Sequence, residues 1–319
     1  MRILFITATR IGDAVLSTGL LAHLVERYEA ARLTIAAGPA AAPLFEAVPR
    51  LERLIVVTKR RWSLHWLALY GAVIGTRWDL VLDLRGSALG YLVWARRRFG
   101  EVRAAEGEHR VAQLARILAL ATPPAPQLYL APRHERAAAE LVPTGTPVLA
   151  IGPAANWRGK QWRAERFAEL AARLTAPGGI LPGARVAVLA ATHERAQAAP
   201  LLAAVPAERL IDLVGGVDLL TAAAVLRRAA LFIGNDTGLM HIAAAAGTPT
   251  LGLFGPTQAA RYAPWGVRTA VAQTAIPSLE LYGADFDHRT TETMMDSLSI
   301  DAAEAATRRL WRDIGGAAA

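Results

Sequence analysis

The chain has 319 residues, with 53% hydrophobic and 19% charged side chains, a balance that excludes a disordered protein and allows two domains. It contains no cysteine, which excludes disulfide bonds and zinc–thiolate or iron–sulfur sites. No apolar run reaches the length of a membrane span, and the apolar stretch within residues 1–7 is too short for a signal peptide, so we expect a soluble or peripheral protein.

In the first half, short apolar runs alternate with helical periodicity, which is typical of an α/β fold. This pattern predicts strands at residues 1–7, 33–38, 54–57 and 79–86, and helices at residues 14–28 and 62–76. Proline-rich stretches at residues 122–126 and 143–147 interrupt the alternation and flank a helix at residues 133–142. The domain boundary is therefore placed in this region.

The alternation restarts in the second half. It predicts strands at residues 148–153, 186–190, 210–213, 231–233 and 250–257, the last running into a glycine loop, and helices at residues 164–174, 219–228, 239–246 and 301–314. We therefore expect an α/β protein with two parallel-sheet domains, residues 1–143 and 144–300, followed by a closing helix and tail at residues 301–319.

The most informative stretch is the turn at residues 234–238 (Gly-Asn-Asp-Thr-Gly), between a buried strand and a helix of small residues. Asp236 or Thr237 can cap the helix, and Gly238 lets a ligand approach the backbone. The free N–H groups at such a helix start bind anions, phosphate above all, and His241 can donate to the same anion. A plain strand–helix turn is the alternative, but a second glycine-rich loop after the next strand favours a ligand site.

Three charged residues outside this turn also lie at or after the carboxyl ends of predicted strands. Asp13 is either the N-cap of a helix or a carboxylate that faces the ligand crevice as a general base. Arg85 is either a surface arginine or a crevice residue. Lys160 lies in a stretch whose spacing does not match a Walker motif, yet it can supply a point charge for phosphate. The motif Gly-x-Gly-x-x-Gly is absent, which disfavours a nicotinamide oxidoreductase.

The net charge of +8 is concentrated in two clusters of the first half, residues 59–62 (Lys-Arg-Arg-Trp) and 96–98 (Arg-Arg-Arg), with Trp66 and Trp94 nearby. A solvated, arginine-rich face would explain them. So would contact with an anionic polymer, an anionic substrate or a membrane surface. Nucleic acid is the weakest of these, because no recognised nucleic-acid module accompanies the charge.

Four motifs, in this order along nearly the whole chain, resemble the bacterial heptosyltransferase family, glycosyltransferase family 9. They are residues 10–18 (RIGDAVLST), 79–86 (DLVLDLRG), 160–162 (KQW) and 235–257, which contains NDTGLMHIAA, GTP and LFGPT. The resemblance implies a GT-B fold, in which two Rossmann-like domains with parallel sheets face each other across a cleft.

The same resemblance implies an inverting glycosyltransferase that moves a heptose from an ADP-linked donor to a lipopolysaccharide core or related anionic glycolipid, with no metal and no other cofactor. Such an enzyme is expected in the cytoplasm, in peripheral contact with the cytoplasmic face of the inner membrane, and without a nucleic-acid partner. Two alternatives stay open. One is a transferase or epimerase of similar architecture that uses a different donor sugar, and the other is a catalytically silent nucleotide-sugar-binding protein.

The resemblance also implies residue roles. Asp13 would be the catalytic base that deprotonates the acceptor hydroxyl, and Arg85 would bind an acceptor phosphate or carboxylate. The nucleotide-sugar-binding residues would be Lys160, Asp236, Thr237, Gly238, Leu239 and His241. Residues 237–239 would supply backbone donors to the diphosphate, Lys160 a formal charge, and Asp236 a contact to the donor sugar or to the turn. The residues expected against the membrane are Lys59, Arg60, Arg61, Trp62 and Trp66.

Overall fold

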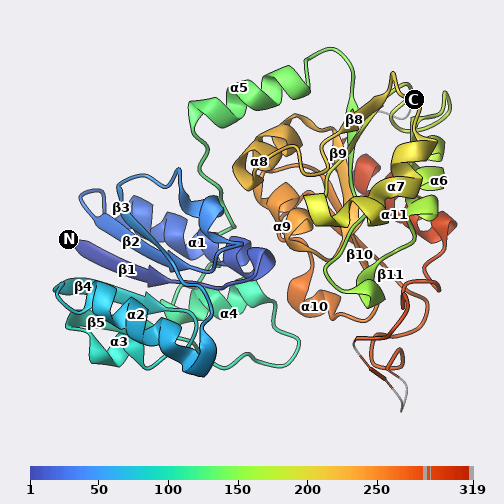
Figure 1. Cartoon of the computed structure of the whole chain (residues 1–319). Coiled ribbons are helices and arrows are strands. Elements are labelled where there is room, and N and C mark those ends of the chain that lie inside the picture. The colour runs from blue at the N-terminus through green and yellow to red at the C-terminus, as the bar shows by residue number, and fades with distance from the viewer. Residues whose placement is uncertain (283–285, 288, 316–319) are drawn as a thin grey trace. The chain divides into compact units, whose positions relative to one another are not determined.

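The computed structural model describes residues 1–282, 286–287 and 289–315, and the chain divides into two compact units, Met1–Ala131 and Pro132–Ala319 (Figure 1). Helix α5 (Pro132–Leu141) belongs to the second unit, because it packs on helix α8 (Leu219–Arg228) of that unit. The boundary predicted at residue 143 lies after this helix, whereas the two units divide before it. The end of the predicted tail, residues 316–319, lies outside the described residues.

The first unit is built on a parallel sheet of five strands in the order β3-β2-β1-β4-β5. The strands are β1 (Arg2–Ile6), β2 (Arg32–Ala37), β3 (Leu51–Val56), β4 (Trp78–Asp83) and β5 (Ala95–Gly100). The helices are α1 (Ile11–Arg27), α2 (Leu64–Val73), α3 (Leu89–Leu92) and α4 (Arg110–Ile117), with short 3-10 helices η1 (Ala42–Phe45) and η2 (Arg61–Ser63). Leu4 and Ile6 of β1 pack with Leu69 and Val73 of α2 in the core on one face of the sheet.

The second unit is built on a parallel sheet of six strands in the order β11-β10-β9-β6-β7-β8. The strands are β6 (Val148–Gly152), β7 (Arg185–Val188), β8 (Leu210–Asp212), β9 (Leu231–Asn235), β10 (Thr250–Phe254) and β11 (Thr269–Gln273). Besides α5 and α8, the helices are α6 (Ala164–Thr175), α7 (Arg195–Ala204), α9 (Gly238–Ala245), α10 (Ala259–Tyr262) and α11 (Ile300–Asp313), with 3-10 helices η3 (Arg158–Lys160) and η4 (Thr192–Glu194). Because all paired strands are parallel, their carboxyl ends meet at one edge of each sheet.

The α/β class and the parallel sheets predicted from the sequence are confirmed, and helix α8 has the predicted bounds. The helix predicted at residues 14–28 begins earlier, at Ile11. The helix predicted at residues 62–76 is shorter, because Trp62 and Ser63 have left-handed backbone angles and α2 starts only at Leu64. The sequence predicts no bounds for β5, β11 or α7. Within the described ranges, no helix combines the length and the apolar character needed to cross a bilayer.

Candidate functional site

The predicted turn lies between β9 and α9 at the carboxyl edge of the second sheet. Strand β9 ends at Asn235, and α9 begins at Gly238 with Thr237 as its N-cap residue. The Thr237 side chain makes no capping hydrogen bond, and the Asp236 carboxylate binds Lys160 instead of the helix. The first turn of α9 therefore presents backbone N–H groups that have no partner within the helix, as an anion site requires.

Lys160 and Asp236 form an ion pair beside this helix start. Lys160 Nζ lies 2.8 Å from Asp236 Oδ2, and the two side chains are 22% and 7% exposed. His241 Nε2 lies 4.0 Å from the other carboxylate oxygen of Asp236 and its side chain is buried. The structure thus brings together the predicted residues of the second unit: a cation, a carboxylate, an imidazole and a helix N-terminus.

Asn235 holds the loop that carries Lys160, a role that the sequence analysis missed. The side chain is fully buried; its Nδ2 donates to the carbonyl of Pro153 at 2.7 Å, and its Oδ1 accepts from the backbone N–H of Trp162 at 3.1 Å. Asn235 therefore ties both ends of the Lys160 loop to the end of β9. The sequence did offer a signal for this role: Asn235 is an amide side chain at the end of a buried strand, and a buried polar group needs hydrogen-bond partners.

Further hydrogen bonds fix the same loop from outside. Gln161 Nε2 donates to the Ala155 carbonyl at 2.8 Å, and the Ala155 N–H donates to Gln197 Oε1 at 3.1 Å. Trp162 is buried, donates from Nε1 to the Leu298 carbonyl at 2.9 Å and stacks edge-on against Phe167. The ammonium of Lys160 is therefore carried on a well-anchored segment rather than on a free loop.

Two paired glycines near the carboxyl ends of β6 and β9, Gly152 and Gly234, allow these strands to approach closely. A Cβ at Gly234 would lie 2.6 Å from Cζ of Phe232 and 3.1 Å from the carbonyl oxygen of Gly152. A Cβ at Gly152 would in turn lie 3.0 Å from Phe232 and from Leu239 Cδ2. These positions need glycine because the Phe232 ring fills the space above both strands.

Asp13 lies in the first turn of α1, the helix that follows β1, and is half-buried. The N-cap of α1 is Arg10, so the interpretation of Asp13 as the N-cap is wrong; the extended backbone of Arg10 starts the helix earlier than predicted. A carboxylate in the first turn still interacts favourably with the helix dipole. Its place near the carboxyl edge of the first sheet is the one that a general base would need.

Arg85 follows β4, the neighbour of β1, and is therefore near the same edge of the first sheet. Its guanidinium lies over the Trp66 ring, 4.7 Å from the ring centre. Asp83 fixes the start of this loop by accepting from the N–H groups of Arg85 and Ser87, each at 3.0 Å, and from the Ser87 hydroxyl. Burial raises the pKa of the Asp83 carboxyl, and these hydrogen bonds oppose the shift.

The predicted site residues thus fall into two groups on different units. Lys160, Asp236, Thr237, Gly238, Leu239 and His241 belong to the second unit, and Asp13 and Arg85 to the first.

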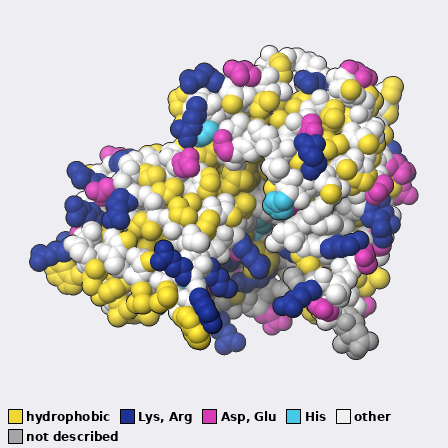
Figure 2. All heavy atoms as spheres, in the orientation of Figure 1, with side chains coloured by type: hydrophobic (Ala, Val, Ile, Leu, Met, Phe, Trp, Pro, Cys, Tyr) yellow, Lys and Arg dark blue, Asp and Glu magenta, His cyan; other side chains and the backbone are white. Residues whose placement is uncertain are grey.

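The two basic clusters differ in character. In β5, Arg98 donates to the carbonyls of Gly90 and Val93, each at 3.0 Å, so it stabilises the end of α3. Arg96 lies 3.8 Å from Asp79. Residues 59–62 are exposed, and Figure 2 shows hydrophobic side chains gathered with Lys and Arg at the lower left, where Figure 1 shows α2 and α3.

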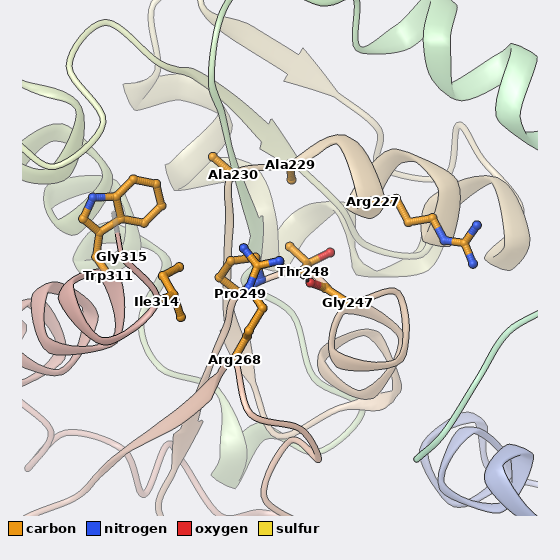
Figure 3. Close-up of a pocket in the computed structure, with 10 residues that line it drawn as sticks. All are labelled: Arg227, Ala229, Ala230, Gly247, Thr248, Pro249, Arg268, Trp311, Ile314 and Gly315. Carbon is orange, nitrogen blue, oxygen red and sulfur yellow. Dashed lines mark hydrogen bonds between the residues drawn. The ribbon is translucent and has the colours of Figure 1, made fainter. Parts of the chain in front are cut away.

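A separate cavity of about 310 Å³ lies at the amino ends of β9, β10 and β11 (Figure 3). Its lining includes Ala230, Pro249 and Arg268, which directly precede these strands. None of the predicted site residues lines it, because they lie at the carboxyl edge of the sheet.

The architecture and the site define an α/β protein of the GT-B fold class. The solved Escherichia coli ADP-heptose lps heptosyltransferase II superimposes with a TM-score of 0.75 at 20% identity, covering 99% of this chain and 100% of that one. The profile of glycosyltransferase family 9 (heptosyltransferase) matches residues 69–282. The chain therefore belongs to glycosyltransferase family 9 and is a glycosyltransferase.

Two curated relatives match along most of their length. Lipooligosaccharide heptosyltransferase 2 of Haemophilus ducreyi is 25% identical over 297 residues, which cover 81% of this chain and 84% of the relative. Lipopolysaccharide heptosyltransferase 1 of Pseudomonas aeruginosa is 26% identical over 297 residues, which cover 81% of this chain and 79% of the relative.

Proposed function

We propose that the chain is an inverting heptosyltransferase that moves a heptose from an ADP-linked donor to a lipopolysaccharide core or related anionic glycolipid. The observation that carries the proposal is the Lys160–Asp236 pair beside the first turn of α9. A departing diphosphate needs positive charge, which an ammonium and a helix N-terminus can supply from the protein itself. The names of the relatives support heptose as the sugar and a bacterial saccharide as the acceptor.

On the donor side, the backbone N–H groups of residues 237–239 bind the diphosphate, and Lys160 neutralises the charge that develops as the bond to the sugar breaks. His241, buried next to Asp236, holds or polarises the same group. Asp236 orders Lys160 and the turn and contacts the donor sugar. These interactions strengthen as negative charge grows on the leaving group, so they favour the transition state over the bound substrate.

On the acceptor side, Asp13 takes the proton of the attacking hydroxyl. The acceptor oxygen bonds to the anomeric carbon from the face opposite the diphosphate, and the bond from that carbon to the phosphate oxygen breaks. A single displacement of this kind inverts the anomeric configuration and leaves the proton on Asp13 and the negative charge on ADP. Arg85, stacked on Trp66, binds an acceptor phosphate or carboxylate.

The enzyme acts in the cytoplasm, at the cytoplasmic face of the inner membrane, because its proposed acceptor is anchored there. The exposed basic residues 59–61 support peripheral contact with an anionic surface.

The assignment of the base is tested with Asp13→Ala. We expect kcat to fall about 10²–10⁴-fold, because general base catalysis is lost, while ADP affinity measured by calorimetry is unchanged. Glu29→Ala, an exposed carboxylate after the same helix, is the matched control and should keep full activity. An active Asp13→Ala enzyme would refute the assignment.

The donor is tested by calorimetry with ADP, UDP and GDP, followed by transfer assays with the corresponding sugars. Preference for ADP and transfer of heptose support the proposal. Tighter binding of UDP or GDP would favour a transferase of the same fold with another donor. Binding of ADP without transfer to any core saccharide would favour a nucleotide-sugar-binding protein.

A further inference from the structure

The first unit carries a group of exposed apolar side chains around helix α2. Trp62 is 79% exposed, Leu67 66%, Tyr91 81%, Leu92 62% and Trp94 61%. Leu64 and Ile74 are exposed as well. These seven residues, here called the apolar face, come from η2, from α2 and the residue that follows it, and from α3 and the residue before β5.

Helix α2 is apolar on both of its sides, which is unusual for a helix at a protein surface. Its inward positions, His65, Leu69 and Val73, are buried, and the latter two pack in the core of the first unit. Its outward positions include Leu64 and Leu67, and the helix contains no Asp, Glu, Lys or Arg. A surface helix of a globular protein normally has a polar outer side. The outward side of α2 therefore has the composition of a contact surface.

The elements of the apolar face adjoin one another. Helix α2 contacts η2 and α3, and α3 contacts β5. The hydrophobic side chains at the lower left of Figure 2 lie where Figure 1 shows α2 and α3, which agrees with one continuous patch.

The charges around the apolar face are almost all positive. Residues 56–98 contain eight Lys or Arg and two Asp. Asp83 is buried, and Asp79 accepts from the Arg2 backbone N–H at 2.8 Å. Arg61 lies 5.2 Å from the Trp62 ring centre and Arg77 4.3 Å from that of Trp94, so cations stand directly beside the exposed aromatic rings.

We propose that the apolar face docks on the surface of a lipid bilayer that contains anionic headgroups, with α2 lying in the plane of the interface. Trp, Tyr and Leu side chains insert at headgroup depth, and the adjoining Lys and Arg bind lipid phosphates. A second copy of the chain fits less well, because pairing two such faces would bring their positive rims together. The inference deepens the proposed function, since it specifies how the enzyme reaches a membrane-anchored acceptor.

The structure also changes the set of residues that we expect to touch the membrane. Trp66, expected there from the sequence, is only partly exposed and lies beneath the Arg85 guanidinium. Trp66 therefore positions Arg85, while Trp62, Leu67, Tyr91 and Trp94 make the contact. Binding then has an apolar component that salt does not screen, in addition to the electrostatic one.

The test is sedimentation of the full chain with vesicles of phosphatidylcholine and phosphatidylglycerol. We expect binding that weakens but persists at about 1 M salt, where the Debye length is about 3 Å. The double variant Leu67→Glu/Tyr91→Glu should bind about 100-fold more weakly, because each change removes an inserted side chain. Both positions are exposed, so the fold should be kept, as circular dichroism can verify. Val267→Glu, at a fully exposed position of the second unit, is the control and should bind like the original chain.

Unchanged vesicle binding by the double variant would overturn the inference. The inference would also be overturned if the original chain did not bind vesicles but formed a concentration-dependent dimer that the double variant abolishes. Transfer to a delipidated, water-soluble core saccharide separates this inference from the proposed function. The double variant should retain that activity, whereas failure of the original chain to transfer would count against the proposed function alone.

Discussion

The Lys160–Asp236 pair makes the sharpest prediction, because each residue can be removed separately. Lys160→Met leaves the Asp236 carboxylate, 7% exposed, without the ammonium at 2.8 Å. Removing one partner of a fully buried pair costs about 3–5 kcal/mol. The Lys160 side chain is 22% exposed, so solvent screens part of this interaction, and we expect a loss of about 2–3 kcal/mol.

Asp236→Asn should cost less, about 1–2 kcal/mol, because the Lys160 ammonium it leaves behind can reach water. The double variant Lys160→Met/Asp236→Asn should be more stable than the sum of the two losses predicts, by about 1–2 kcal/mol, since the pair is already broken by either change. This coupling energy isolates the ion pair from the other effects of the substitutions.

Differential scanning calorimetry of the full chain is the assay, because two units need not unfold in one transition. For a unit of this size, about 2 kcal/mol corresponds to a fall in Tm of about 4–8 °C. The control is Arg163→Met, which breaks a bidentate pair with Asp296 whose side chains are 52% and 46% exposed. Because solvent screens this pair, its loss should cost at most about 1 kcal/mol. Additive single losses, to within about 0.3 kcal/mol, would refute the ion pair as a contributor to stability.

Two further predictions concern the second unit. Asp218→Ala should lower stability by about 1 kcal/mol, because Asp218 caps α8 by accepting from Thr221 N at 2.8 Å. Burial alone would raise the pKa of Asp218, but hydrogen bonds from the Thr221 backbone and hydroxyl lower it below 3.8, so this stabilisation is present above that pH and is lost as the pH falls through the folded-state pKa. Gly234→Ala should lower stability by about 1–3 kcal/mol and weaken ADP binding, because the new Cβ would displace the Phe232 ring.

Calorimetric melting of the variants at several pH values checks both. Gly178→Ala, where a Cβ would meet nothing within 4 Å, is the control for Gly234→Ala. The packing argument fails if both alanine variants melt alike. The capping argument fails if Asp218→Ala keeps the acid dependence of the original chain.

The sequence predicted the bounds of an element correctly where the capping, periodicity and termination signals all lay within or directly beside that element. Helix α8 has an acidic cap at Asp218, continuous small and apolar residues, and arginines at its end, and its predicted bounds are confirmed. Strand β5 was not recognised, because three consecutive arginines mask its pattern; it lies at the sheet edge, where charged side chains are tolerated. The late start of α2 could not be predicted either, because the left-handed backbone angles before it fall on Trp62 and Ser63 and not on a glycine that would have marked them.

The site could be predicted as a set of positions but not as a set of contacts. The motif around residues 234–238 indicated a ligand turn, and the structure places a helix start there. The Lys160–Asp236 contact joins loops that are far apart in sequence and depends on the order of β6 and β9 in the sheet. The same holds for Asn235, whose buried hydrogen bonds reach the backbone on both sides of the Lys160 loop.

The partnership of Lys160 with Asp236 has a consequence for the end of a catalytic cycle. A carboxylate that already binds the ammonium competes with any other anion for it. In the proposed role of Lys160, spent nucleotide would therefore share the cation with Asp236 and would leave more easily. Without that competitor, ADP would be retained longer, and turnover would slow wherever product release limits the rate. The residue that steadies the cation would thereby also keep the enzyme from being trapped by its own product.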